Sequence, residues 1–288
     1  MAGRTARRRV LKVTIPREGD AVTQHRADLL ATEEPLGIRV GGQALTMTMR
    51  TPGDDIELTA GFLVSEAIVT RKDDVKEIRL CDGASCRHDV HEDHEIGNIA
   101  DVTLTSAATA VAAGKRRGFM TTSACGVCGK TSVEDICVLP RAPLATDETR
   151  FDAAMLATLP ARLRQAQKVF TSTGGLHAAG LFTPAGDMIA VREDVGRHNA
   201  VDKIVGWALL DGRLPLRGTA LLVSGRASFE LVQKAVLAGI PLLAAVSAPS
   251  SLAAELAAES GLTLAGFVRD GPNGSSMNVY TGADRILV

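Results

Sequence analysis

Aromatic side chains are scarce in this chain of 288 residues, where Phe, Trp and Tyr together make up 3% of the sequence. Apolar residues nevertheless reach 45%, so the core must be built from Ala, Val, Leu and Ile. No stretch approaches the roughly 20 consecutive apolar residues that a membrane-spanning helix needs. The composition therefore predicts a well-packed soluble protein and excludes a membrane protein of the helical type.

An excess of charge is also missing, since 32 Lys and Arg residues stand against 33 Asp and Glu residues. This balance gives no global attraction to nucleic acid or to an anionic membrane, so any anion site must be local. A basic cluster at the N-terminus begins at Arg4 and is followed by residues 10–16, which are too short and too charged for a signal-peptide core. We expect a solvated basic tail or the start of an edge strand there.

Cysteines are few and odd in number, with five in the chain. Without a secretory signal, this count predicts a cytoplasmic protein with free or metal-ligating thiols rather than a disulfide framework.

The pattern of apolar, polar and glycine residues divides the chain into four segments. We expect a basic tail and edge segment over 1–33, a smaller strand-rich α/β domain over 34–120, a CxxC loop with a linker over 121–150, and an α/β domain over 151–288. In the last segment, apolar strands alternate with helices, which predicts a partly parallel sheet covered on both faces.

Individual elements of the first domain can be predicted from periodicity. Alternating or apolar runs predict strands at 44–49, 78–80 and 99–104, and a helix is predicted over 56–68 with Asp54 or Asp55 as its cap. Residues 106–120 are expected to form a linker.

The second domain is predicted in the same way. Residues 151–168 are expected to form a helical pair with Pro160 at a helix start. Asp194 is expected to cap a helix that ends at Gly212. The remaining predicted elements are strands at 178–182, 188–192, 219–223, 242–246, 262–268 and 277–280, with helices at 228–238 and 251–259.

The stretch Cys125-Gly126-Val127-Cys128-Gly129 is the strongest local signal of chemistry. Its glycines permit backbone conformations that bring both sulfurs to one incoming atom. Lys115, Arg116 and Arg117 precede it, and a positive field favours thiolate. The residues alone leave metal binding, disulfide exchange and sulfur transfer open.

A zinc site is one alternative. Cys81 and Cys86 could combine with Cys125 and Cys128, and three histidines lie in the same insert: His88, His91 and His94. The C-x4-C spacing is looser than in most zinc knuckles, and 38 residues separate the two cysteine pairs. We therefore favour a polar hairpin loop and predict no metal.

Two enzyme classes fit the cysteines poorly. A zinc deaminase needs H-x-E and P-C-x-x-C, whereas no histidine here is followed two residues later by Glu, and Ala124 precedes Cys125. A thioredoxin-like enzyme places CxxC in an early βαβ unit, which the position of Cys125 does not match.

Three loops at predicted strand ends carry residues suited to an anion. Ser224, Arg226 and Ser228 lie between a strand and a helix, Ser247 opens the next such loop, and the third contains Arg269, Asp270 and Gly271. Ligands of such sheets bind beyond the carboxyl ends of the strands, where helix N-termini and guanidinium groups hold phosphate. This arrangement predicts a nucleotide or phosphorylated cofactor.

A polar cluster lies earlier in the same half. Asp194, Arg197 and His198 fall within one turn of a predicted helix start, and His177 follows two glycines. These groups are either part of a ligand site or an ordinary helix cap with an ion pair.

Taken in order, several motifs resemble the formate dehydrogenase accessory sulfurtransferase family, FdhD. They are the CGVCG loop at 125–129, EDVGRHNAVDK at 193–203, SGRASFE at 224–230 and Gly266-Phe267. The resemblance runs from about Glu34 to the C-terminus. It implies a smaller N-terminal α/β domain followed by a cytidine-deaminase-like domain, in a homodimer.

The resemblance also implies a function. A cysteine desulfurase would hand sulfur to Cys125 as a persulfide, with Cys128 as the second thiol, for transfer to the molybdenum or tungsten bis-guanine-dinucleotide cofactor of formate dehydrogenase. The matching cofactor-binding stretch is Phe267, Val268, Arg269, Asp270, Gly271 and Pro272. Residues 272–276 lengthen the turn after it relative to the family pattern. The competing class is a zinc-stabilised nucleotide-binding module without sulfur transfer.

Overall fold

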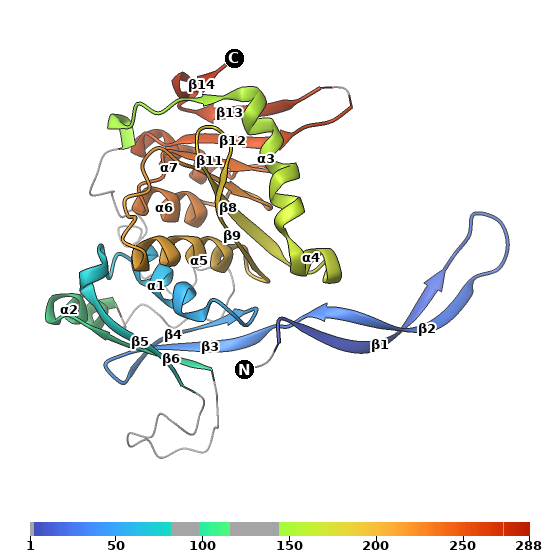
Figure 1. The fold of residues 1–288 in the computed structure, drawn as a ribbon, viewed down its shortest axis with the longest axis horizontal. Helices are drawn as coiled ribbons and strands as arrows, with labels where there is room; N and C mark the ends of the chain where they lie inside the picture. The colour runs from blue at the N-terminus through green and yellow to red at the C-terminus, as the bar shows by residue number, and fades with distance from the viewer. Residues whose placement is uncertain (1–2, 82–97, 116–143, 273) are drawn as a thin grey trace.

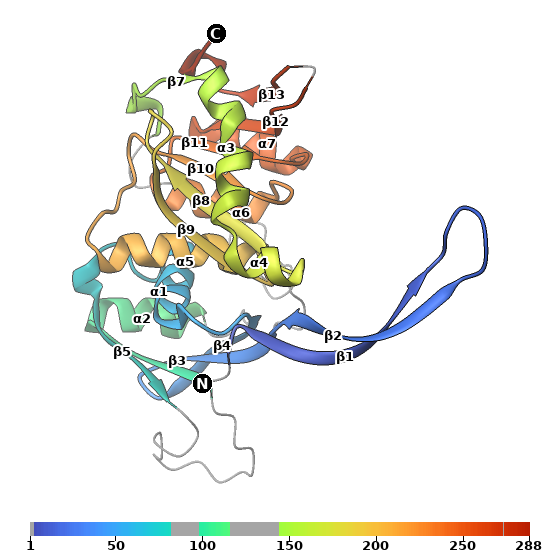
Figure 2. The same ribbon diagram turned by 45° about the vertical axis from the view of Figure 1, so that its right-hand side comes forward.

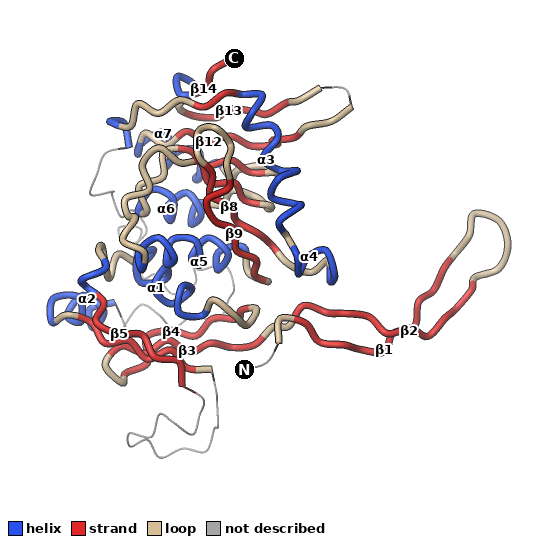
Figure 3. Tube along the Cα trace, viewed as in Figure 1, coloured by secondary structure: helices blue, strands red, loops and turns tan. Residues whose placement is uncertain are grey.

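The computed structural model describes residues 3–81, 98–115, 144–272 and 274–288. Two sheets dominate it, with helices between them and on the outer face of the larger one, and a long hairpin projects from the side (Figure 1). The mixed α/β class predicted from the sequence is confirmed. The Cα trace coloured by secondary structure shows the same layering of helices and strands (Figure 3).

The larger sheet has six strands in the order β13-β12-β11-β10-β8-β9. Its central strands β10, β11 and β12 run parallel, and the other pairs are antiparallel. The partly parallel sheet expected over 151–288 is thus present. The strands are β8 (His177–Phe182), β9 (Met188–Asp194), β10 (Ala220–Val223), β11 (Leu242–Ala245), β12 (Thr263–Arg269) and β13 (Ser276–Thr281).

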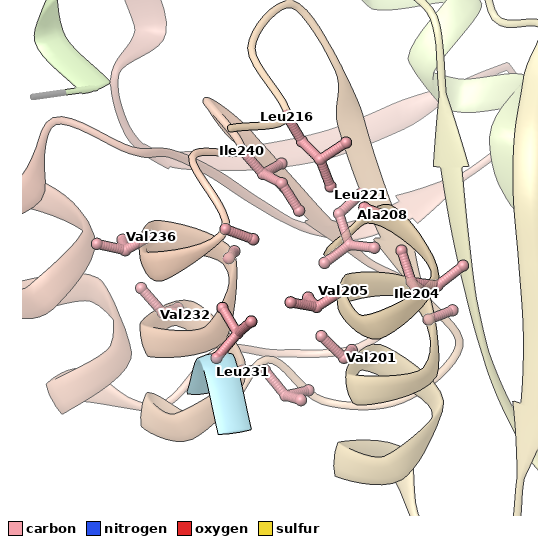
Figure 4. Close-up of a cluster of buried hydrophobic side chains, with 14 of the residues drawn as sticks. Val201, Ile204, Val205, Ala208, Leu216, Leu221, Leu231, Val232, Val236 and Ile240 are labelled. Atoms are coloured by element: carbon pink, nitrogen blue, oxygen red, sulfur yellow. The ribbon is translucent and has the colours of Figure 1, made fainter. Parts of the chain in front are cut away.

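Helices cover both faces of this sheet. On one face lie α5 (Arg197–Leu210), α6 (Phe229–Leu237) and α7 (Ser251–Ser260), and α3 (Ala153–Ala166) covers the other. Alternate residues of β10 point to opposite faces, so Leu221 joins the cluster under α5 and α6, whereas Leu222 joins the cluster under α3. Figure 4 shows the first cluster, where Val201 and Val205 of α5 face Leu231 and Val232 of α6.

The smaller sheet has four strands in the order β4-β3-β6-β5. They are β3 (Glu34–Val40), β4 (Gln43–Arg50), β5 (Val75–Cys81) and β6 (Ile99–Leu104). Helix α1 (Asp55–Ser65) lies between this sheet and α5, and the buried side chains on both sides of it belong to one continuous cluster. The two sheets therefore share a hydrophobic core.

Helices α1 and α5 cross with their backbones in direct contact. A Cβ atom built on Gly61 would lie 1.8 Å from the Asp202 carbonyl oxygen, and one built on Gly206 would lie 1.8 Å from the Glu57 carbonyl oxygen. No side chain fits at either position. Beside the crossing, the Arg192 guanidinium of β9 binds both carboxylate oxygens of Glu57 at 2.5 and 2.7 Å.

The hairpin of β1 (Thr5–Thr14) and β2 (Val22–Ala31) forms an arm that leaves the body in both views (Figures 1 and 2). Its base is fixed by the Arg4–Asp54 ion pair. The basic stretch was expected to be a solvated tail or the start of an edge strand; the second alternative is confirmed, because β1 is one strand of a two-stranded ribbon with ten residue pairs.

Two local expectations are wrong, and a third is confirmed only for the position of the residue. Residues 106–115, expected to be linker, form α2 (Ser106–Lys115). Pro160 lies inside α3 rather than at a helix start, and the lost backbone hydrogen bond is tolerated because the buried Leu156, Leu159 and Leu163 hold the helix to the sheet. Asp54 is the N-cap residue of α1, as predicted, but it takes a left-handed conformation and its side chain makes no capping hydrogen bond; its carboxylate binds Arg4 instead.

Short elements complete the fold: α4 (Lys168–Thr173), β7 (Phe151–Asp152) and β14 (Ile286–Leu287), the last two pairing in parallel. Among the described residues, no helix has both the length and the apolar character required to cross a bilayer.

Candidate functional site

The site is organised around Asp194, the fully buried last residue of β9. One carboxylate oxygen accepts the Gly196 N–H at 2.8 Å and the Asn199 side-chain amide at 2.9 Å. The other accepts the Thr51 N–H at 3.1 Å. Gly196, and not Asp194 as expected, is the N-cap of α5. By accepting hydrogen bonds from the Gly196 N–H and the Asn199 side chain, Asp194 fixes the position of the first turn of α5.

A buried lysine completes this network. Lys203 is 1% exposed, and its ammonium lies 2.8 Å from Asp194 Oδ2 and 3.0 Å from the Thr51 carbonyl oxygen. The Thr51 hydroxyl accepts the Val195 N–H at 3.1 Å. The residue that follows β4 and the start of α5 are thus held together, 144 positions apart in the chain.

The first turn of α5 presents His198 to the start of α6. Its Nε2 lies 3.2 Å from the Ser228 hydroxyl and 3.7 Å from Glu230 Oε2. Burial alone would raise the pKa of Glu230, but hydrogen bonds from His198, Ser228 and its own backbone N–H outweigh it and lower the pKa to about 2. Glu230 is therefore a carboxylate at neutral pH and orients the imidazole.

His177 and Arg197 meet at Gly225. A Cβ atom at Gly225 would lie 3.4 Å from His177 Nδ1 and 3.9 Å from Arg197 Cδ, so glycine allows the loop after β10 to lie against both side chains. Burial, followed by the charges of Arg197 and His198, lowers the pKa of His177 despite the opposing charge of Asp194. His177 is therefore neutral at pH 7.

The side chain of Arg197 also indicates that a ligand could bind in this cluster. Its Nε atom is buried and has no hydrogen-bond partner among the described residues. A buried guanidinium N–H without an acceptor is costly, so an anion that reaches this atom would relieve the cost.

Ser224 connects the same loop to the sheet. Its hydroxyl accepts the Ala178 N–H at 2.9 Å, and its own N–H donates to the Ala178 carbonyl. The structure therefore brings together six predicted site residues: His177, Asp194, Arg197, His198, Ser224 and Ser228. Arg226 lies in the same loop and is exposed.

The neighbouring strand ends form one continuous edge with this cluster. The loop after β10 pairs with the loop after β11 through Ala227 and Ala248. The backbone carbonyl oxygen of Ser247 accepts the Phe267 N–H at 3.2 Å, so the end of β12 lies beside this loop. Phe267 is 42% exposed and takes a left-handed conformation, with φ of 53°. Such strain in a bulky residue is concentrated at ligand sites.

The turn predicted to bind cofactor continues from Phe267. Val268 points into the core with 0% exposure, so only its backbone is available to a ligand. Arg269 donates to Ser276 at 2.9 Å and Asp270 accepts from Ser275 at 2.8 Å, within their own hairpin. Gly271 and Pro272 are exposed.

The cysteine loop with Cys125 and Cys128 lies outside the described residues, as do Cys86, His88, His91 and His94. Cys81 closes β5 and is disulfide-bonded, so the expectation of free or metal-ligating thiols is wrong for this residue. Within the described ranges, no group of three or more His, Cys, Asp or Glu side chains is arranged to hold a metal.

Sequence reasoning missed the groups that hold the cluster in place, namely Thr51, Asn199, Lys203 and Glu230. Lys203 offered a signal, because it lies between Val201 and Ile204 on an apolar helix face, where a charge needs a buried partner. Thr51 offered none, because its contact to Val195 depends on how the two sheets pack.

The low pKa of Glu230 predicts a pH-dependent stability. Since its folded pKa of about 2 lies below the ordinary value of 4.5, the carboxylate stabilises the fold above pH 4.5, by about 3 kcal/mol when 1.36 kcal/mol is counted per pKa unit. This contribution is lost as the pH falls from 4.5 towards 2.

Glu230→Gln should therefore flatten the fall in unfolding free energy across this acid range, measured by urea denaturation at pH 7, 4 and 3. The matched control is Glu255→Gln on the exposed surface of α7, which should leave the pH profile unchanged. An unaltered acid slope in Glu230→Gln would contradict the assignment.

Comparison with a solved structure supports the fold. The chain superimposes on the crystal structure of a proposed formate dehydrogenase accessory protein from Desulfotalea psychrophila with a TM-score of 0.71, covering 98% of this chain and 99% of that one at 24% identity. The fold is thus that of a mixed α/β protein in which the parallel strand ends and the start of α5 bring the predicted site residues together. The chain belongs to the FdhD/NarQ family, whose model matches residues 31–287.

Two relatives are similar to this chain over nearly its whole length. A protein of Mycolicibacterium paratuberculosis named sulfur carrier protein FdhD is 56% identical over 282 residues, covering 98% of each chain. A protein of the same name from Nocardia farcinica is 53% identical over 287 residues, covering 99% of this chain and 96% of the relative.

Proposed function

We propose that this chain is a cytoplasmic sulfur carrier that serves a formate dehydrogenase. The observation that carries the proposal is the 56% identity, over 98% of both chains, to a relative named sulfur carrier protein FdhD. The CGVCG sequence at 125–129 supplies the thiols that such a role requires.

Sulfur enters by thiolate exchange. The Cys125 thiolate attacks the terminal sulfur of a persulfide on a cysteine desulfurase, the sulfur–sulfur bond of the donor breaks, and the donor leaves as a thiolate. Cys125 then carries the persulfide. The three cations at 115–117 favour the reactive thiolate form.

Sulfur leaves by a second exchange. The Cys128 thiolate attacks the Cys125 sulfur, a Cys125–Cys128 disulfide forms, and the terminal sulfur departs as hydrosulfide toward the acceptor. A thiol reductant then restores the two cysteines by a two-electron reduction.

The acceptor in this proposal is the molybdenum or tungsten bis-guanine-dinucleotide cofactor of the client, bound as a substrate. Its diphosphate groups match the cluster chemically, because Arg197 has a buried N–H without an acceptor and His198 and Ser228 lie beside it. The adjoining edge with Ser247 and the exposed Phe267 ring would receive the nucleoside part.

The test of the carrier role is sulfur loading. After incubation with a cysteine desulfurase and cysteine, the intact protein should gain one sulfur atom in its mass spectrum, and addition of a thiol reductant should remove it. A chain that gains no sulfur under conditions that load a known carrier would refute the function.

The nucleotide site is tested separately with guanosine diphosphate. Arg197→Met should weaken its binding about 10- to 100-fold, the loss expected for one hydrogen bond to a charged group. The matched control is Arg217→Met, an exposed arginine, which should bind normally in calorimetry. Equal affinities for the wild-type chain and Arg197→Met would remove Arg197 from the site.

A further inference from the structure

The β1–β2 arm begins beside the candidate site. A Cβ atom on Gly175 would lie 3.4 Å from the Ala31 Cβ atom of the arm, and Gly175 precedes His177 of the site by two residues. At the base of the arm, the Thr32 N–H donates to the Arg4 carbonyl oxygen at 3.0 Å. In both ribbon views the arm leaves the body next to α4, the helix that leads into this loop (Figures 1 and 2). A molecule bound at this edge of the body therefore has the arm beside it.

The ribbon has two unlike faces, which follow from its register. Side chains alternate between the faces along each strand, and directly paired residues share a face. We call the face that carries Ala31 the inner face, because Ala31 meets the body at Gly175. The ten residue pairs place five side chains of β1 on this inner face, namely Thr5, Arg7, Arg9, Leu11 and Val13.

The two arginines of the inner face are available to a partner. Arg7 and Arg9 are exposed, and neither forms an ion pair with a residue that the structure describes. On the opposite, outer face, Arg8 lies directly across from Asp28, which also binds Arg26 at 3.3 Å. The paired residues of the inner face include no carboxylate. This face therefore presents uncompensated positive charge close to the site.

Farther from the body, the same face becomes apolar. Leu11 is 53% exposed and Val13 is 52% exposed, and none of the described core clusters contains a residue before Leu36. A two-stranded ribbon buries too little apolar surface to be stable by itself. Arginine and exposed apolar side chains in one row are typical of a surface that binds another protein. A nucleic acid would match the cations but would leave the apolar side chains without a partner.

We propose that the inner face of the arm is the docking surface for the client formate dehydrogenase. The inference rests on the proposed function, in which the cofactor of the client binds at the site as a substrate. The client must then approach the edge of the body that the arm flanks, whereas the sulfur donor needs only to reach Cys125. The partner surface that fits carries carboxylates opposite the two arginines and apolar side chains opposite Leu11 and Val13.

The charged part of this surface is tested by binding of a purified formate dehydrogenase, produced in cells that lack the carrier, in biolayer interferometry. Arg7→Ser with Arg9→Ser should weaken binding about tenfold or more at low salt, and less at high salt, because salt screens the attraction. The matched control is Arg8→Ser with Lys12→Ser, which removes two charges from the outer face of the same strand. The control should change the affinity by less than about twofold.

The apolar part is tested with Leu11→Ser and Val13→Ser combined. Binding of the same formate dehydrogenase should weaken about tenfold or more, because two apolar side chains no longer leave water on docking. This loss should be the same at low and high salt. Thermal unfolding should match that of the wild-type chain, because no residue of the arm belongs to a described core cluster.

Two further readouts separate this inference from the function on which it rests. Sulfur loading by a cysteine desulfurase and binding of guanosine diphosphate should be unchanged in all arm variants. A wild-type chain that gains no sulfur refutes the proposed function itself. If the wild-type chain loads sulfur but does not bind formate dehydrogenase, the docking inference alone is wrong.

The variants can overturn the inference in three other ways. Inner-face variants that bind formate dehydrogenase as tightly as the wild-type chain would remove the arm from the interface, and an equal loss in the outer-face control would show a nonspecific charge effect. Inner-face variants that lose sulfur loading would assign the arm to the donor. A changed sedimentation coefficient of the free variants would place the inner face between copies of this chain.

Discussion

Cys125→Ser should gain no sulfur from a cysteine desulfurase, whereas the wild-type chain gains one sulfur atom per molecule. The serine hydroxyl is nearly isosteric with the thiol, but it is not ionised at neutral pH and cannot displace a thiolate from a persulfide. Intact mass measurement with the donor in excess reports the result directly. The expected loss is complete, because no group replaces the first nucleophile.

Cys128→Ser provides the matched variant. It should still take up sulfur on Cys125, but release should slow by at least about tenfold, because the attacking thiol is no longer held next to the persulfide. Time-resolved mass spectra after removal of the donor measure this rate. Sulfur found on Cys128 in Cys125→Ser, or equal release rates in Cys128→Ser and the wild-type chain, would reverse or remove the assigned roles.

Gly206→Ala should destabilise the fold by about 4 kcal/mol or more, beyond the usual cost of an added methyl group in a packed core. The new Cβ atom would lie 1.8 Å from the Glu57 carbonyl oxygen and 2.6 Å from the Gly61 nitrogen. Neither atom can rotate away, since both belong to the backbone of α1. The helices must separate, which opens the core shared by both sheets.

Gly114→Ala is the control for Gly206→Ala. Gly114 also lies in a helix, α2, but a Cβ atom there would meet nothing within 4 Å. Alanine should therefore stabilise this helix by about 0.5–1 kcal/mol. Urea denaturation of both variants measures the contrast. A loss below about 1 kcal/mol in Gly206→Ala would show that α1 and α5 are not in backbone contact.

The alternation of strands and helices after residue 175 could be predicted from the sequence, because each helix there packs on a face of the sheet and leaves a regular apolar pattern. Leu221 and Leu222 are both buried, as a strand covered on two sides requires. The ends of the expected and observed elements differ by at most three residues, and several coincide. The three predicted anion-site loops also follow from strand order, since parallel strands end at a common edge.

Other features depended on contacts between distant segments. Pro160 reads as a helix start locally, yet the buried leucines around it keep α3 continuous. The sequence left a solvated tail and an edge strand open for Arg7, Arg8 and Arg9, and it did not predict the partner strand, residues 27–29, with which they pair. Asp194 read as a helix cap, but its partners Thr51 and Lys203 lie on separate elements.

The helix crossing at Gly61 and Gly206 also sets the order in which the chain can fold. The face of α1 that packs on α5 has no partner until residues about 140 positions later have been synthesised. Contacts of such long sequence separation form slowly, and the incomplete first sheet leaves its apolar face exposed in the meantime. Nascent chains that end before α5 should therefore depend on a chaperone, whereas those that extend past Leu210 can bury that face.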